Sequence, residues 1–230
     1  MAEGSRVNFP LSGTNAAIGL AAFLLGWYVV GLQIGRRRAS RLVKQIRGSI
    51  ESFGGNATIR WFGRSAFRIE VEHPTTAPLA KLTVSLLLEP RETFLLWALG
   101  RCYGRRDWMI VSAGLAGSVK AIFEVYRPRR RGAFDSAHEI KELGWPVAPL
   151  PGRPDLLLAA PGPDGQGLAG QVLPLFHGLD VWRVRIRNKE PQISISVPVP
   201  AQETCVPLPV FTLLPQAADL ILSGRSEKEA

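Results

Sequence analysis

The chain has few of the residues that carry most enzyme chemistry, with two cysteines and three histidines among 230 residues. Cys102 and Cys205 lie far apart and match no metal-binding or redox spacing, which makes a reducing cytosol the simplest setting. His73 and His177 belong to no recognisable catalytic motif, and no phosphate loop or acyl-transfer turn is present. The sequence therefore predicts a non-catalytic protein without cofactor, metal or small-molecule substrate. A site assembled from distant positions stays open.

Two short patterns come close to known motifs and fall short of them. Gly165 to Gly170 has the spacing of dinucleotide-binding glycines, with Glu190 further along, but prolines stand where that motif needs a strand. His138 to Glu142 resembles the start of a zinc-protease helix, although Glu142 replaces the second histidine. We expect a flexible loop at the first pattern and a solvated helix face at the second.

No charge interrupts the stretch from Ala16 to Ile34, and only Gln33 within it is strongly polar. As a helix it would be roughly 28 Å long, about the thickness of the hydrocarbon core of a bilayer. A buried core helix rarely needs an apolar surface all the way round. A signal peptide would carry its basic residues first and a cleavage site afterwards. We therefore predict a retained transmembrane helix at 16–34.

Basic residues are more frequent than acidic ones, 28 against 19, and the formal net charge is +9. Many of them follow the apolar stretch at once, so the positive-inside rule places residues 1–15 outside and the residues after the stretch in the cytoplasm. This flank is expected to rest on anionic lipid headgroups, or to be the solvated face of a domain helix. Its members are Arg36, Arg37, Arg38, Arg41, Lys44 and Arg47.

Small and polar residues share one narrow stripe of the predicted transmembrane helix at 100° per residue. The stripe comprises Gly19, Ala22, Gly26 and Gln33, with Asn15 at its outer end. Such a surface allows another helix to approach closely, so the stripe predicts a membrane-protein partner, against chance clustering of small residues. Trp27 and Tyr28 lie near the middle of the stretch and are also expected to pack on protein.

The remaining sequence predicts an α+β domain with a largely antiparallel sheet and several helices. Residues 35–53 are expected to form a basic juxtamembrane helix, 54–223 the domain, and 224–230 a polar tail. Proline and glycine between 144 and 170 mark a candidate subdivision. The expected strands cover 59–61, 67–71, 82–88, 108–113, 119–126, 155–159, 181–186 and 193–197, and the expected helices 92–102, 134–143, 168–176 and 209–222.

A second group of arginines lies within the predicted domain, with Tyr103, Trp108 and Tyr126 close to it in sequence. Arginine binds phosphate in a planar, bidentate manner and stacks on bases, so this group is compatible with RNA or ribosome binding. It is equally compatible with a basic surface near an acidic membrane, and charge runs are often merely solvated. The group comprises Arg101, Arg105, Arg106, Arg127, Arg129, Arg130 and Arg131.

The order of several hydrophobic stretches carries a family resemblance. They are IGRRRASRLVKQIRGSIESF, KLTVSLLLEPRETFLLWALGR, WMIVSAGL, RPDLLLAA, VLPLFHGLDVWRVRI, ISISVPVP and LPVFTLLPQAADLIL. In this order the chain resembles the calumin family, single-pass endoplasmic-reticulum proteins of the PAT complex that assists biogenesis of multi-pass membrane proteins. The resemblance implies a single span, a cytosolic α+β domain and a non-catalytic, client-binding or chaperone role.

The chain also departs from that family. Residues 1–15 are too short for the family's acidic luminal region, and no long charged helix follows the predicted domain. Calcium binding and ribosome contacts through that helix are therefore not carried over, and a reduced, prokaryotic-type relative is expected. The reading is a membrane-anchored scaffold, with a membrane-tethered RNA-binding protein as the second interpretation and a membrane-anchored enzyme as the third.

Overall fold

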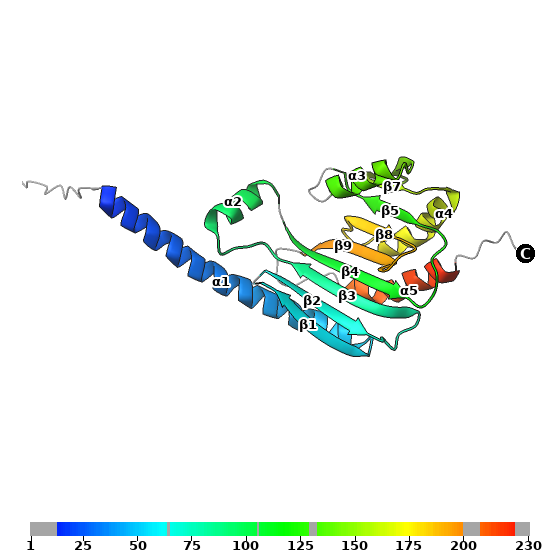
Figure 1. Cartoon of the computed structure of the whole chain (residues 1–230), viewed down its shortest axis with the longest axis horizontal. Coiled ribbons are helices and arrows are strands. Elements are labelled where there is room, and N and C mark those ends of the chain that lie inside the picture. The colour runs from blue at the N-terminus through cyan, green and yellow to red at the C-terminus, as the bar shows by residue number, and fades with distance from the viewer. Residues whose placement is uncertain (1–12, 64, 105, 129–132, 200–207, 224–230) are drawn as a thin grey trace, which may run out of the picture.

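A computed structural model describes residues 13–63, 65–104, 106–128, 133–199 and 208–223. The protein is α+β, with a long apolar helix at its N-terminal end and one large antiparallel sheet (Figure 1). The strand order is β1-β2-β3-β4-β9-β8-β5-β7-β6, and every neighbouring pair is antiparallel. The predicted fold class is thus confirmed for the helices and the sheet.

The described elements follow one another with short connections. The strands are β1 (Asn56–Phe62), β2 (Ala66–Glu72), β3 (Leu79–Leu87), β4 (Asp107–Leu115), β5 (Phe123–Tyr126), β6 (Val147–Leu150), β7 (Arg153–Ala159), β8 (Arg183–Ile186) and β9 (Ile193–Val199). The helices are α1 (Gly13–Glu51), α2 (Phe94–Cys102), α3 (Ala133–Glu142), α4 (Pro163–Val172), the 3-10 helix η1 (Leu173–Phe176) and α5 (Pro209–Ser223).

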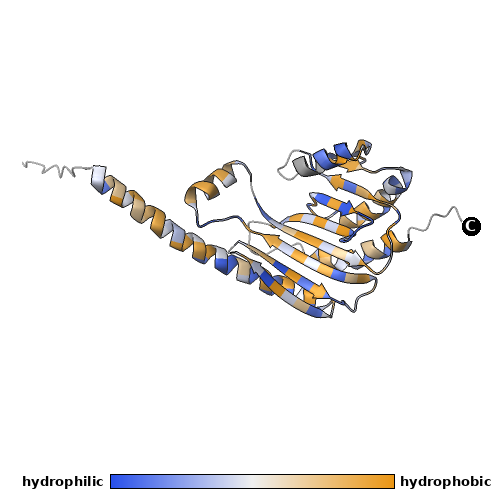
Figure 2. Cartoon of the chain, in the orientation of Figure 1, coloured by the Kyte–Doolittle hydropathy of each residue, from blue (hydrophilic) through white to orange (hydrophobic). Residues whose placement is uncertain are grey.

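Helix α1 is a single element of 39 residues, where the sequence suggested two helices meeting near residue 35. It contains no proline, and it ends where Gly54 and Gly55 take positive φ angles of 66° and 80°. By length and composition it is the one described helix that suffices to cross a membrane. The hydropathy changes along it, apolar first and then polar and amphipathic toward the sheet (Figure 2).

The C-terminal part of α1 belongs to the core of the domain. Leu42, Ile46 and Ile50 are buried on the face of the sheet that α4 and α5 also cover. Phe53 follows α1 and meets Phe211 of α5, with ring centroids 6.4 Å apart. Alternation along the strands fills this face: Val84, Val111 and Ile195 are among its fully buried side chains, whereas their chain neighbours are more exposed.

Helix α3 lies on the opposite face, over the half of the sheet that contains β5, β7 and β8. Val184 and Ile186 of β8 point into the main core, whereas Arg183, Arg185 and Arg187 alternate with them and reach α3. Ile140 of α3 packs on Tyr126 and Ala159 in a smaller second core. The sheet is therefore covered on both faces at this end.

The proline- and glycine-rich segment from 144 to 170 is more regular than the sequence suggests. It contributes β6, β7 and most of α4 to the same structure. The expected loop at 165–170 is wrong, because these residues lie inside α4. The expected helix at 168–176 is α4 continued by η1, and the strand expected at 119–126 is shorter, since β5 begins at Phe123.

Candidate functional site

The candidate functional site is the pair formed by helix α2 and the apolar part of α1, residues 16–34, because both helices expose apolar side chains. We call this pair the apolar arm. Helix α2 lies between β3 and β4, and Figure 1 shows it beyond the end of the sheet, on the side of the apolar part of α1. Every side chain from Phe94 to Leu99 is apolar, in the order FLLWAL.

Aromatic side chains hold the two helices of the apolar arm together. The ring of Trp27 lies 4.9 Å from that of Phe94 and 5.4 Å from that of Trp97, measured between centroids. Phe23 meets Phe94 edge-on at 5.6 Å. The indole N–H of Trp27 donates a hydrogen bond to the carbonyl oxygen of Arg91 at 3.0 Å. The prediction that Trp27 packs on protein is confirmed, and its partner is α2 of the same chain.

Gly31 sets how closely the two helices approach. A Cβ atom at this position would overlap the carbonyl group of Arg91 and lie 2.9 Å from the Cα atom of Glu92. The backbone that leads into α2 therefore rests directly on α1. A glycine is required here because of this close approach and not because of a turn.

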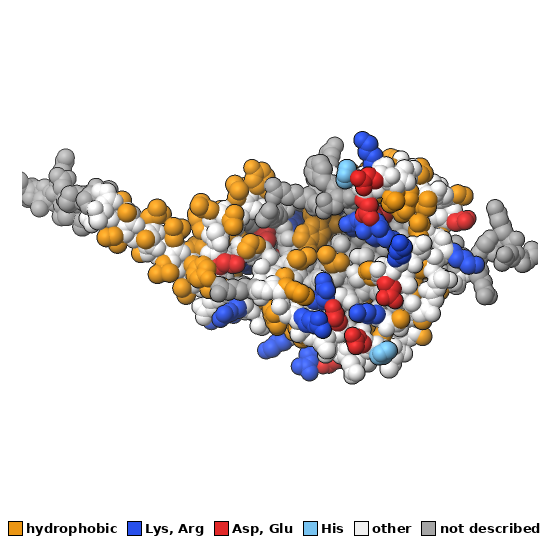
Figure 3. All heavy atoms as spheres, viewed as in Figure 1, with side chains coloured by type: hydrophobic (Ala, Val, Ile, Leu, Met, Phe, Trp, Pro, Cys, Tyr) orange, Lys and Arg blue, Asp and Glu red, His pale blue; other side chains and the backbone are white. Residues whose placement is uncertain are grey.

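The outer surface of the apolar arm is exposed. Leu95, Leu96 and Leu99 of α2 are 70%, 54% and 55% exposed, and Leu25 of α1 is 66% exposed. Figure 3 shows hydrophobic side chains along both helices, in contrast to the mixed surface of the domain. Contiguous apolar surfaces of this kind mark sites that meet a membrane or another protein.

A buried charge cluster lies where the apolar arm joins the sheet. Asp107, the first residue of β4, is 3% exposed and accepts a hydrogen bond from the backbone N–H of Glu89 at 2.7 Å. Its carboxylate forms ion pairs with Arg38 of α1 at 2.7 Å and with Arg91 at 3.5 Å. One carboxylate thus connects α1, the strand that follows α2 and the segment that precedes it.

The structure removes Arg38 from the lipid-facing flank that the sequence predicted. Its side chain is 9% exposed and is held by Asp107, so it points into the protein. The other members of the flank, namely Arg36, Arg37, Arg41, Lys44 and Arg47, are exposed. Arg47 forms an ion pair with Glu51 one turn along the helix, at 2.6 Å. Lipid contact by these five residues stays a prediction.

The stripe of small residues lies on a part of α1 that α2 does not cover. Gly19, Ala22, Gly26 and Gln33 are all exposed, and a Cβ atom at Gly19 or Gly26 would meet nothing within 4 Å. Helix α2 occupies the neighbouring face, that of Trp27 and Gly31. Within the described residues the stripe is therefore open to another helix, and its partner stays a prediction.

The structure describes only part of the arginine group that was considered for RNA binding. Arg127 forms ion pairs with Asp155 at 2.8 Å and Asp180 at 3.1 Å, and its guanidinium lies 5.8 Å from the ring centre of Trp182. Its charge is thus compensated within the chain, whereas Arg106 is exposed. The side chain of Arg101, and the residues Arg105, Arg129, Arg130 and Arg131, lie outside the described part of the structure.

A charged network that the sequence did not predict joins β5, β8 and α3. Glu124 is fully buried and accepts hydrogen bonds from the Nε atoms of Arg183 and Arg185 at 2.7 and 2.8 Å. Glu139 of α3 pairs with Arg185 and Arg187 at 2.7 and 2.6 Å. Partial burial raises the pKa of Glu139, but hydrogen bonds and charge from both arginines outweigh it and hold that pKa below its usual value.

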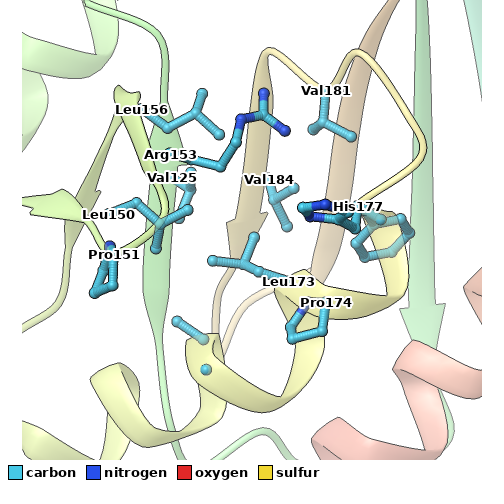
Figure 4. Close-up of a pocket in the computed structure, with 13 residues that line it drawn as sticks. Val125, Leu150, Pro151, Arg153, Leu156, Leu173, Pro174, His177, Val181 and Val184 are labelled. Atoms are coloured by element: carbon cyan, nitrogen blue, oxygen red, sulfur yellow. The ribbon is translucent and has the colours of Figure 1, made fainter.

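The described chain also contains an apolar hollow of about 450 Å³ between α4, η1 and the strands β5 and β8 (Figure 4). Val125, Leu156, Leu173 and Val184 are among its lining residues, and Arg153 is its charged one. Arg153 Nε is already bound to Asp155 at 3.1 Å. No group of three histidine, cysteine or acidic side chains that could hold a metal occurs among the described residues.

Comparison with known proteins adds no further assignment. No protein-family model matches the chain, and no curated protein matches it.

Proposed function

We propose that the chain is a membrane-anchored accessory protein that holds its α+β domain at the cytoplasmic surface and binds another membrane protein, as in membrane-protein biogenesis. The observation that carries this proposal is the continuity of α1. Its apolar part is exposed, while Leu42, Ile46 and Ile50 of the same helix are buried in the core. A helix of this kind fixes the domain to the membrane at a set distance and orientation, as a scaffold requires.

The alternative of a cleaved signal sequence fits this geometry less well. Cleavage after residue 34 would cut an unbroken helix shortly before Arg38, which is bound to Asp107. The basic residues also follow the apolar stretch, which favours a retained anchor with its C-terminal side in the cytoplasm.

The stripe of Gly19, Ala22, Gly26 and Gln33 is the proposed contact with the partner. The partner would be a transmembrane helix that packs closely on the small residues and hydrogen-bonds the amide of Gln33. Trp27 and Gly31 are engaged by α2, so the stripe leaves the internal packing of the apolar arm undisturbed.

The experiment is affinity purification of the full chain in mild detergent, scored for membrane proteins and for ribosomal RNA. We expect Gly26→Leu to lose the membrane-protein partner, because leucine would hold the second helix away from the stripe. Ala21→Leu is the matched control: Ala21 is also exposed, and at 100° per residue it faces away from both the stripe and α2. It should retain the partner.

Three results would count against this proposal or part of it. Equal recovery of the partner with both variants would exclude the stripe as the contact. Recovery of ribosomal RNA without membrane proteins would favour the RNA-binding alternative. Extraction of the full chain from membranes by alkaline carbonate would exclude the transmembrane anchor itself.

A further inference from the structure

We infer that α2 is a second membrane-embedded element, which enters the cytoplasmic leaflet beside α1. Lipid acyl chains would then cover the outward leucine face of α2. The inference rests on the proposed transmembrane anchor and adds a contact that a single-span protein would lack. With nine residues, α2 is too short to cross a bilayer. The chain must therefore enter and leave the membrane on the same side, where β3 ends and β4 begins.

The position of α2 along α1 sets its depth. The rings of Phe94 and Trp97 contact Trp27, seven positions before the end of the apolar stretch at Ile34. At 1.5 Å per residue this corresponds to about 10 Å, which lies within the acyl region near the headgroups. Helix α2 thus lies at the level of the inner leaflet, on the side of the basic flank.

The two sides of α2 differ in a way that suits this location. At 100° per residue Phe94 and Trp97 face α1, whereas Leu95, Leu96 and Leu99 share the outward face. The outward face from Leu95 to Leu99 is therefore aliphatic, and exposed apolar side chains also run along the neighbouring part of α1 (Figure 3). This proximity to the proposed span identifies lipid as the occupant, because acyl chains that surround α1 at this level also reach α2.

The polar residues of α2, Arg101 and Cys102, are confined to its last turn, and the rest of the helix from Phe94 to Gly100 is without polar side chains. Tyr103, directly after the helix, is 65% exposed, in the position that tyrosine favours at a membrane–water interface. The carbonyl of Arg91, before the helix, is satisfied by the indole of Trp27. The ion pairs of Asp107 with Arg38 and Arg91 lie where the apolar arm joins the sheet, on the water side of α2. The backbone N–H and C=O groups at the ends of α2, which would lack hydrogen-bond partners in the hydrocarbon region, thus lie near the interface.

The test uses the full chain reconstituted in liposomes, with Cys102 and Cys205 replaced by serine. Single cysteines are labelled with an environment-sensitive fluorophore in Leu99→Cys, in Leu20→Cys on α1, and in Leu143→Cys after α3. Leu99 and Leu143 are 55% and 50% exposed, so protein contacts alone give them similar environments. The quenchers are iodide in the aqueous phase and a nitroxide attached near the headgroup end of the acyl chain.

We expect the label at residue 99 to be quenched by the lipid nitroxide and to be several-fold less sensitive to iodide than the label at residue 143. The label at residue 20 should also be quenched by the lipid nitroxide, because it lies on the proposed anchor. Iodide quenching at 99 equal to that at 143, with 20 still in lipid, would overturn the inference and leave the anchor intact. Protection of residue 99 from both quenchers would show a protein occupant and would also overturn it. Loss of lipid quenching at residue 20 would instead overturn the proposed anchor.

Discussion

Asp107 is the residue on which the junction between the apolar arm and the sheet depends. It is buried with Arg38, half-buried Arg91 and the backbone N–H of Glu89 around it. Removal of one partner from a buried pair leaves the other charge without compensation, which costs far more than the loss of an exposed pair. Helix α1 therefore allows a direct comparison of a buried ion pair, Arg38 with Asp107 of β4, and an exposed one, Arg47 with Glu51.

We expect Asp107→Ala to lower the free energy of unfolding by about 3 kcal/mol, because Arg38 would stay buried without its carboxylate. Asp107→Asn should lie between this variant and the parent, since an amide oxygen can still accept the hydrogen bond from Glu89. Urea unfolding of the full chain in detergent micelles, followed by tryptophan fluorescence, gives both values.

The control for this prediction is Glu51→Ala, which removes the pair of Arg47 and Glu51, with side chains 74% and 60% exposed. This change should cost less than about 0.5 kcal/mol. Similar losses for the Asp107 and Glu51 variants would show that the junction contributes no more than an exposed pair.

Glu139 provides a pH-dependent contact between α3 and the sheet. Its pKa in the folded chain is lower than its usual 4.5, so its contribution is fully present above pH 4.5 and is lost as the pH falls through the lowered pKa. Glu139→Gln should therefore reduce stability at neutral pH and flatten the decline in stability below pH 4.5. Chemical unfolding across that pH range measures both effects.

Glu142→Gln is the matched control for Glu139, because Glu142 lies on the same helix and pairs only with the exposed His138 in the described contacts. Its acid decline should follow that of the parent chain. If Glu139→Gln and the parent lose stability in parallel as the pH falls, Arg185 and Arg187 do not lower the pKa of Glu139 in the folded state.

At the level of elements, the contact between α1 and α2 depends on a residue without a side chain. Gly31 and Gly26 lie on the same helix, but only Gly31 faces the backbone of Arg91 and Glu92. We expect Gly31→Leu to separate α2 from α1 and to speed tryptic cleavage at Arg106 in liposomes, where Gly26→Leu should not. Equal cleavage of both variants would show that α2 is held by other contacts.

Alternation and turn residues predicted most of the sheet correctly. Val84, Leu86 and Gly63 could be placed from local sequence, because a strand with one buried face has a period of two and Gly63 turns with a φ of 74°. The glycines at 165–170 were misread, since Gly165 lies in α4 and packs on the carbonyl group of Ile122, a contact that local sequence does not show.

The candidate site was predictable only in part, for a related reason. The apolar stretch and the small-residue stripe follow from composition and helical period. The ion pair of Arg38 with Asp107 joins positions 69 apart, and the contact of Trp27 with Phe94 joins positions 67 apart. Neither pair has a local signature, so Arg38 was assigned to the lipid-facing flank and the contact between α1 and α2 was not predicted.

For the molecule as a whole, the central prediction is its orientation. In a chain without Cys102 and Cys205, Ser5→Cys should react with an impermeant reagent in intact cells, because the basic flank keeps the other side in the cytoplasm. Ser223→Cys, at the end of α5, should react only after the cells are opened. Labelling of residue 223 in intact cells would place the sheet outside and contradict the cytoplasmic assignment.

Because α1 is one unbroken helix, a tilt of its proposed membrane-spanning part would also move the domain. A span that is longer than the local bilayer is thick tilts to fit it, and in known structures spans tilt by about 20° on average. The 17 residues from 35 to 51 extend about 25 Å beyond the proposed span, so a tilt of that size would move their far end sideways by about 9 Å. Changes in bilayer thickness would thus be converted into lateral movement of the domain.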